Sequence, residues 1–191
     1  MIDVSVIIMA SGYSKRMGEN KLFLKYKNKT FLEHTLTLVN KVDFFERILV
    51  ISPENVKDIV LPENITVVLN SEPELGQSAS VRLGTKVASG QGYLYLPIDQ
   101  PLLNKEIIEQ LLKVSTNENI VFPVHENGHP SSPVFFGKDF RSELLAVSGA
   151  SGGREVRKNH PEVWKKVKID EPERLLDIDT QEDFTFLKTF N

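Results

Sequence analysis

The chain of 191 residues contains no cysteine, which excludes disulfide bonds, thiolate metal sites and a cysteine nucleophile. It also lacks an excess of basic residues. Its 23 lysines and arginines stand against 26 aspartates and glutamates, which gives a formal net charge of −3. Proteins dedicated to nucleic acids usually carry a basic excess, so this balance argues against a nucleic-acid partner.

Long apolar runs are absent as well. No stretch approaches the roughly 18 residues of a membrane helix. The first residues, Met1-Ile2-Asp3, lack the basic segment of a signal peptide. We therefore expect a cytoplasmic protein without a membrane partner. Hydrophobic residues make up 40% of the chain and charged residues 26%, and no flexible linker divides it, so residues 1–191 are expected to form a single domain.

Apolar runs alternate with helical patterns along the chain. Val4–Met9 is almost entirely apolar, which is typical of a strand covered on both faces. Thr30 and Glu33 form a capping box for a helix that runs to about Val39. Further strands are expected at Ile48–Ile51, Ile65–Leu69, Tyr93–Leu96, Ile120–Phe122, Pro133–Phe136 and Val167–Ile169, with helices over Ser78–Val87, after Asn104 and after Thr180. This alternation predicts an α/β fold, a Rossmann-like three-layer sandwich with a mainly parallel central sheet.

A basic, glycine-containing loop follows the first predicted strand, where α/β proteins place their ligands. The loop spans Ala10 to Lys21 and contains Gly12, Gly18 and the cations Lys15, Arg16 and Lys21. Glycine lets backbone N–H groups approach a phosphate closely, and arginine and lysine add charge. The loop is neither a Walker A motif nor a dinucleotide fingerprint. It is either a triphosphate cradle or a solvated turn.

Three aspartates also follow predicted strands or precede a predicted cap. Asp99 comes just after Tyr93–Leu96, and Asp177 and Asp179 precede the C-terminal capping box. Carboxylates that converge at one sheet edge suit Mg²⁺, which prefers oxygen ligands. The alternative is that Asp99 caps a turn and Asp179 caps a helix. Asp177 either lies beside the metal ligands or is solvated.

Two further polar residues lie in predicted loops. His129 lies in a turn between Gly128 and Pro130, and Arg154 follows the small-residue loop of residues 149–153. The guanidinium group of arginine can donate two parallel hydrogen bonds to an anion. The alternatives are a solvated histidine and a flexible connector between helices.

The particular residues in these motifs resemble those of a known protein family. The segment S-G-x-S-x-R-M-G-x-x-K over residues 11–21 resembles the N-terminal signature of nucleotidyltransferases with the sugar-nucleotide-transferase fold, and is most similar to the molybdenum cofactor cytidylyltransferase group. Later stretches resemble motifs of that group in the same order: Asn70, Gly76–Gly84, Asp99-Gln100-Pro101, Gly128-His129-Pro130, Gly149–Arg154 and Asp177–Thr180. The sequence departs from the family at Ser11, where alanine is usual, and at Gln181, where proline is usual.

The resemblance implies a nucleotide-diphospho-sugar transferase type of fold and a Mg²⁺-dependent nucleotidyltransferase. The implied reaction joins CTP to the terminal phosphate of molybdopterin, or its molybdenum-loaded form, and releases pyrophosphate. A molybdenum hydroxylase is a candidate recipient of the product. Asn20 before Lys21 favours the cytidylyl branch, since related guanylyltransferases have an acidic residue there.

Site residues carried over from the family fall into four groups. The implied catalytic residues are Arg16, Lys21 and Asp99. The implied nucleotide-binding residues are Ala10, Ser11, Gly12, Arg16, Lys21, Asn70, Gly76 and Ser80. His129 and Arg154 are implied for the second substrate, and Asp99, Asp179 and Asp177 for the metal. Two alternatives remain: a nucleotidyltransferase that uses GTP or another phosphorylated acceptor, and a non-catalytic protein that delivers cofactor to a molybdenum hydroxylase.

Overall fold

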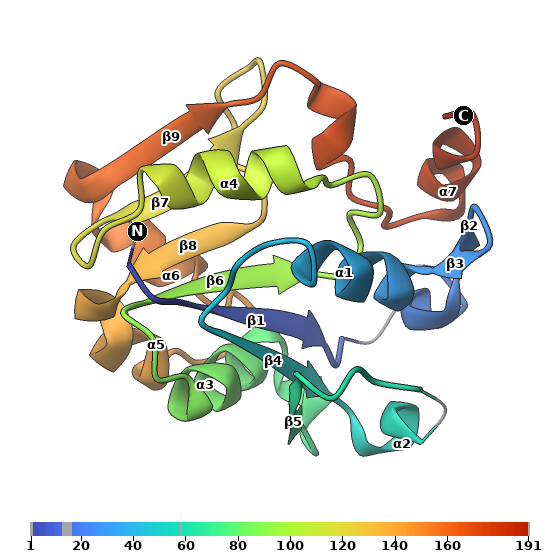
Figure 1. Cartoon of the computed structure of the whole chain (residues 1–191), viewed down its shortest axis with the longest axis horizontal. Helices are drawn as coiled ribbons and strands as arrows, with labels where there is room; N and C mark the ends of the chain where they lie inside the picture. Colours follow the sequence, from blue (N-terminus) through green and yellow to red (C-terminus); the bar gives the residue numbers. More distant parts are fainter. Residues whose placement is uncertain (1, 13–16, 58, 191) are drawn as a thin grey trace.

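A computed structural model describes residues 2–12, 17–57 and 59–190. The described residues form a seven-stranded sheet in the order β5-β4-β1-β6-β8-β7-β9 (Figure 1). The strands are β1 (Val4–Ala10), β4 (Glu46–Ile51), β5 (Thr66–Leu69), β6 (Gly92–Pro97), β7 (Ile120–Val124), β8 (Val134–Gly137) and β9 (Trp164–Lys168). Only β8 pairs antiparallel with its neighbours, β6 and β7, so the predicted mainly parallel α/β sheet is confirmed.

Helices cover both faces of the sheet, as Figure 1 shows. On one face lie α1 (Phe31–Val39) and α4 (Lys105–Lys113), and on the other lie α3 (Gln77–Val87), α5 (Arg141–Ala146) and α6 (Arg154–Asn159). The remaining helices are α2 (Pro53–Val56), α7 (Gln181–Leu187) and five 3₁₀ turns, η1 (Lys21–Phe23), η2 (Pro73–Leu75), η3 (Lys138–Phe140), η4 (Pro161–Val163) and η5 (Pro172–Leu175).

The apolar run of β1 explains this layering. Side chains alternate across a strand, so Val6 and Ile8 join one core while Ile7 joins the other. All three side chains are fully buried. A strand at the centre of a three-layer sandwich has no polar face, which is why its sequence reads as one continuous apolar run.

The order of the strands creates a crevice. From β1 the chain moves outward through β4 to β5, and then crosses to β6 on the other side of β1. After β1 the chain therefore runs toward β4, whereas after β6 it runs in the opposite direction along the sheet, toward β7. The place where the direction reverses is called the topological switch point, and ligands of open α/β sheets bind there, beyond the carboxyl ends of the strands. Among the described residues, no helix has both the length and the apolar character needed to cross a bilayer.

The short helices α2 and α5 were not predicted, and a strand and a hairpin also differ from the sequence prediction. Strand β9 begins at Trp164, whereas the sequence predicted a start at Val167. The earlier start could not be recognised because this edge strand carries several lysines and lacks a clear apolar pattern. A short hairpin of β2 (Lys25–Tyr26) and β3 (Lys29–Thr30) was not predicted at all. Its turn residues, Lys27 and Asn28, have φ of +46° and +63° without any glycine to signal the turn.

Candidate active site

A cavity of about 490 Å³ opens at the switch point, beyond the carboxyl ends of β1 and β6. The loop after β1 contributes Ala10, Ser11 and Gly12 to its wall, and the start of α3 contributes Gly76 and Ser80. The sequence assigned all five of these residues to nucleotide binding. The volume lies within the range of small-molecule sites in proteins, about 300–1,000 Å³.

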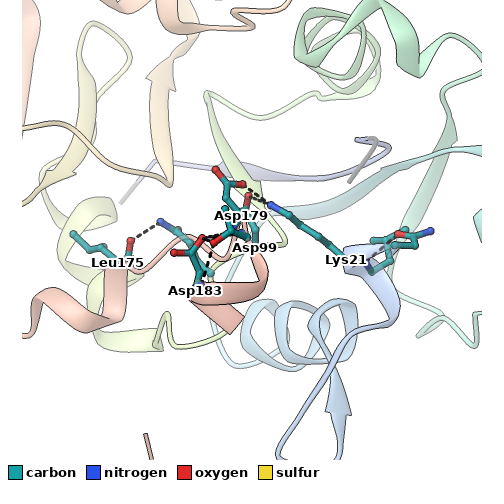
Figure 2. A network of polar contacts seen from close by, with 9 residues as sticks. Lys21, Asp99, Leu175, Asp179 and Asp183 are labelled. Carbon is teal, nitrogen blue, oxygen red and sulfur yellow. Dashed lines mark hydrogen bonds and ion pairs between the residues drawn. The ribbon is translucent and has the colours of Figure 1, made fainter. Parts of the chain in front are cut away.

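Three charged side chains meet on the same wall. The Lys21 ammonium nitrogen lies 2.5 Å from Asp179 Oδ1 and 3.5 Å from Asp99 Oδ2 (Figure 2). Lys21 is the first residue of η1, which Asn20 caps by accepting a hydrogen bond from the Leu22 N–H at 3.1 Å. The cap directs the lysine from the loop after β1 toward carboxylates that stand 78 and 158 positions further along the chain.

Backbone contacts bring the two carboxylates together. The side chain of Ile178 is fully buried, and its N–H donates to the carbonyl of Asp99 at 2.9 Å. Asp183 then accepts hydrogen bonds from the N–H groups of Asp179 and Thr180, at 2.9 and 2.8 Å (Figure 2). Thr180 and Asp183 form the predicted capping box of α7. The alternative that Asp179 caps this helix is wrong, because Thr180 is the N-cap.

The Asp99 carboxyl is suited to a cation. Its Oδ1 is buried and has no hydrogen-bond partner among the described residues. Burial raises the pKa of Asp99. The positive charge of Lys21 opposes this increase, and the negative charge of Asp179 adds to it. The described residues contain no cluster of three or more His, Cys, Asp or Glu side chains with the arrangement of a metal site. Mg²⁺ is commonly held by one or two carboxylates together with substrate phosphates, and the pair of hard oxygen donors here fits that ion or Mn²⁺.

Asn70 lies behind the cavity wall rather than on it. Its side chain is only 1% exposed, and its amide nitrogen donates to Ser11 Oγ at 3.0 Å and, less closely, to Ser80 Oγ at 3.4 Å. The two serine hydroxyls are themselves 2.6 Å apart. This buried network ties the ends of β1 and β5 to α3. The structure therefore places Asn70 where it positions two predicted nucleotide-binding residues.

A second cavity of about 180 Å³ adjoins the first, and the two share wall residues that include Gln77 and Arg154. Asp177 lines the second cavity, whereas Asp179 lines the first. Solvent reaches one side of the Asp177 side chain, but desolvation by the surrounding chain, followed by the negative charge of Asp99, raises the pKa of Asp177 to about 7.

One predicted residue, His129, is not brought into this arrangement, and another, Arg16, is not among the described residues. His129 is exposed and is not among the described residues that line either cavity, although Pro130 and Ser131 beside it line the second one. Its N–H donates to Asn127 Oδ1 at 3.0 Å, which is a turn contact. Its role in binding a second substrate remains a prediction. Arg16 lies outside the residues that the structure describes, so its predicted contact with phosphate also remains a prediction.

The structure adds contacts at residues that the sequence did not assign to the site. Gln77 lines both cavities from the first position of α3, just after Gly76. Gln181, which replaces the family's usual proline, donates to the Met17 carbonyl at 3.0 Å and so ties α7 to the first loop. Arg157 lines the second cavity from α6. Position in the sequence gave no sign of these contacts, which depend on how the helices dock.

A three-layer α/β fold with a ligand cavity at the switch point, and with a lysine beside carboxylates in its wall, is typical of enzymes that bind nucleotides. Residues 6–163 match the family described as "MobA-like NTP transferase domain", and the chain belongs to this family of nucleotidyltransferases.

The similar proteins agree with this assignment. The molybdenum cofactor cytidylyltransferase of Escherichia coli (strain K12) is 25% identical in an alignment that covers 98% of this chain and 97% of that protein. A probable molybdenum cofactor guanylyltransferase of Clostridium perfringens (strain SM101 / Type A) is 28% identical, over 64% of this chain and 60% of the relative. Rv0371C of Mycobacterium tuberculosis H37Rv, solved in complex with manganese, superposes with a TM-score of 0.83 at 20% identity, over 99% of this chain and all of that one. The predicted nucleotidyltransferase fold is confirmed.

Proposed function

We propose that this nucleotidyltransferase transfers CMP from CTP to the terminal phosphate of a molybdopterin-type acceptor and releases pyrophosphate. The observation that carries the proposal is the meeting of Lys21, Asp99 and Asp179 in one cavity with the loop after β1. The relative that matches nearly the full chain is named for the cytidylyl reaction, and the guanylyl relative matches only part of it. A molybdenum hydroxylase is the proposed recipient of the product.

Asp99 and Asp179 would hold Mg²⁺. The unpartnered, buried Oδ1 of Asp99 supports this assignment, because a bound cation would satisfy it. When bound, Mg²⁺ supplies positive charge that offsets the negative charge of the phosphates.

The chain itself aligns the reactants. An acceptor phosphate oxygen forms a bond to the α-phosphorus of CTP, the bond from that phosphorus to the bridging oxygen breaks, and the electron pair leaves with pyrophosphate. A phosphate monoester is largely ionised near neutral pH, so the attack needs no general base. Catalysis then consists of positioning and charge stabilisation. Lys21 and, from the signature, Arg16 offset charge on the leaving pyrophosphate, and the backbone at Ser11 and Gly12 approaches the triphosphate.

Pyrophosphate release with each of the four NTPs, with and without molybdopterin, tests the proposal. We expect release with CTP only when molybdopterin is present, and its loss in Asp99→Asn, which keeps the side-chain size but removes the anionic oxygen. Faster pyrophosphate release with GTP than with CTP would indicate that GTP is the nucleotide substrate. No release by the wild type with any NTP, together with molybdopterin binding, would favour the cofactor-delivery alternative.

A further inference from the structure

Arg157 is a half-buried cation without a counter-ion in the described chain. Its guanidinium carbon lies 4.9 Å from the centre of the Phe122 ring. The Nε atom is buried and has no hydrogen-bond partner, and no hydrogen bond or ion pair joins the guanidinium to another described residue. A buried donor left without an acceptor is costly, and such exceptions require an explanation.

A second cation lies beside it. Arg154 is three residues earlier in α6, so both side chains project from one side of the helix, and both line the second cavity. Burial, and then the charge of Arg154, lower the pKa of Arg157. A cation in the last turn of a helix is favoured by the helix dipole, but an exposed side chain would serve that purpose equally well. The dipole therefore does not explain why Arg157 is buried next to another arginine.

The rest of the second cavity combines an apolar wall with hydroxyl groups. Val81, Tyr95 and Phe136 contribute the apolar side, and Ser131 and Ser132 contribute the hydroxyls. Asp177 is the acidic side chain among the described lining residues, and no described ion pair joins it to either arginine. The cavity therefore offers two unneutralised guanidinium groups next to a surface that suits a ring or an apolar body.

The second cavity is also placed to serve the transfer reaction. Arg154 lines both cavities. Asp177, on the wall of the second cavity, stands two residues from Asp179, on the wall of the first. A ligand held by the arginines would therefore lie next to the cavity that the proposed function assigns to the nucleotide.

We propose that Arg157 and Arg154 form an anion subsite that binds a phosphate monoester carrying a ring or apolar group, and that this is the acceptor in the transfer reaction. The guanidinium fork matches phosphate oxygens in a bidentate manner, which a lysine cannot do. The identity of the ligand as the acceptor rests on the proposed function, whereas the anion subsite itself rests on the two arginines.

Calorimetry with phenyl phosphate as the probe tests the subsite on the full chain. We expect Arg157→Gln to weaken phenyl phosphate binding at least about tenfold, the usual effect of losing a hydrogen bond to a charged group. Arg157→Lys should restore part of the affinity, since it keeps the charge but loses the fork. CTP affinity in Mg²⁺ should stay within about twofold of the wild type. Arg174→Gln is the matched control, because Arg174 pairs with Glu171 at 2.8 Å and is not among the described residues of the second cavity.

Thermal melting of the same variants separates binding from a structural role. Arg157→Gln removes a guanidinium without a described hydrogen-bond acceptor but also its contact with the Phe122 ring, so the variant should melt close to the wild-type temperature. A lower melting temperature with unchanged phenyl phosphate affinity would overturn the subsite. So would equal loss of CTP and phenyl phosphate binding, or no binding of phenyl phosphate by the wild type. If the wild type releases no pyrophosphate but its phenyl phosphate binding depends on Arg157, the subsite stands and the proposed transfer reaction fails.

Discussion

Replacing Asn70 with alanine distinguishes a structural role for this residue from a direct contact with the base. The family resemblance implies that Asn70 binds the nucleotide, but the folded chain buries its side chain to 1% exposure. Its amide nitrogen donates to Ser11 at 3.0 Å, and its amide oxygen accepts from the N–H of Glu72 at 3.0 Å. We expect Asn70→Ala to destabilise the fold and weaken binding of every nucleotide alike.

The magnitude follows from these contacts. Each of the two hydrogen bonds contributes about 0.5–1.5 kcal/mol, and the buried groups left unpaired add a desolvation cost of about 1–3 kcal/mol. Because the serine hydroxyls can turn to bond each other, we expect the lower part of that range, a loss of about 2–3 kcal/mol in the free energy of unfolding. For a domain of this size that corresponds to a fall in Tm of roughly 4–12 °C.

Urea denaturation and nucleotide kinetics together provide the assay. Asn64→Ala is the matched control, since Asn64 is exposed and its amide donates to Asn40, another surface asparagine, at 3.2 Å. The control should change stability by no more than about 0.5 kcal/mol. In Asn70→Ala the KM for CTP should rise, while the ratio of kcat/KM for CTP and GTP stays the same. A variant that is as stable as the wild type, with that ratio shifted tenfold, would refute the structural role and indicate that Asn70 contacts the base directly.

Three further predictions follow from the same geometry. Gly76 has a φ of +80°, and a Cβ there would come within 2.8 Å of the backbone of the loop before α6. Gly76→Ala should therefore lower the free energy of unfolding by about 2 kcal/mol or more, and an unchanged midpoint in chemical denaturation would contradict this prediction. Lys21→Ala should lower turnover by about 10²–10³, because the leaving pyrophosphate loses a positioned positive charge, and normal turnover would show that the lysine acts only as a counter-ion to Asp99 and Asp179. The hydrogen bond to Glu143, opposed by burial and assisted by Glu162, raises the pKa of His160. The protonated pair should stabilise the fold fully below about pH 6.5 and lose this contribution as pH rises through the folded-state pKa, so His160→Gln should flatten Tm against pH, whereas an unchanged profile would refute the pairing.

The sequence predicted those parts of the fold that local chemistry determines. The apolar run of β1 and the capping boxes at Thr30 and Thr180 appear as expected, because each depends on residues within one short segment. The hairpin at Lys27 and Asn28 was missed because its left-handed turn uses no glycine. The start of β9 was missed because an edge strand is held by backbone pairing to β7 and not by an apolar pattern.

For the site, the sequence predicted which strand ends meet but not the direction in which side chains point. Asp99 follows β6 and faces the main cavity, as the α/β pattern predicts. Asn70 also follows a strand, β5, yet it turns inward to the serine hydroxyls. Asp177 and Asp179 stand only two residues apart in the sequence, yet they line different cavities. Such differences depend on the packing of α3 and α7 against the sheet, which no local pattern records.

Unsatisfied polar atoms locate the candidate site independently of any relative. Within the described chain, four buried side-chain atoms lack a hydrogen-bond partner, and they belong to Asp99, Gln100, Asn117 and Arg157. Asp99 lines the first cavity, Arg157 lines the second, and Gln100 donates through its amide to Ser131 on the wall of the second. Nothing in the structure explains Asn117. Folded chains satisfy nearly all buried polar groups, and exceptions concentrate where a ligand completes the bonding. The acidic atom in one cavity and the basic atom in the next are therefore the positions that the proposed cation at Asp99 and the proposed anion at Arg157 would satisfy.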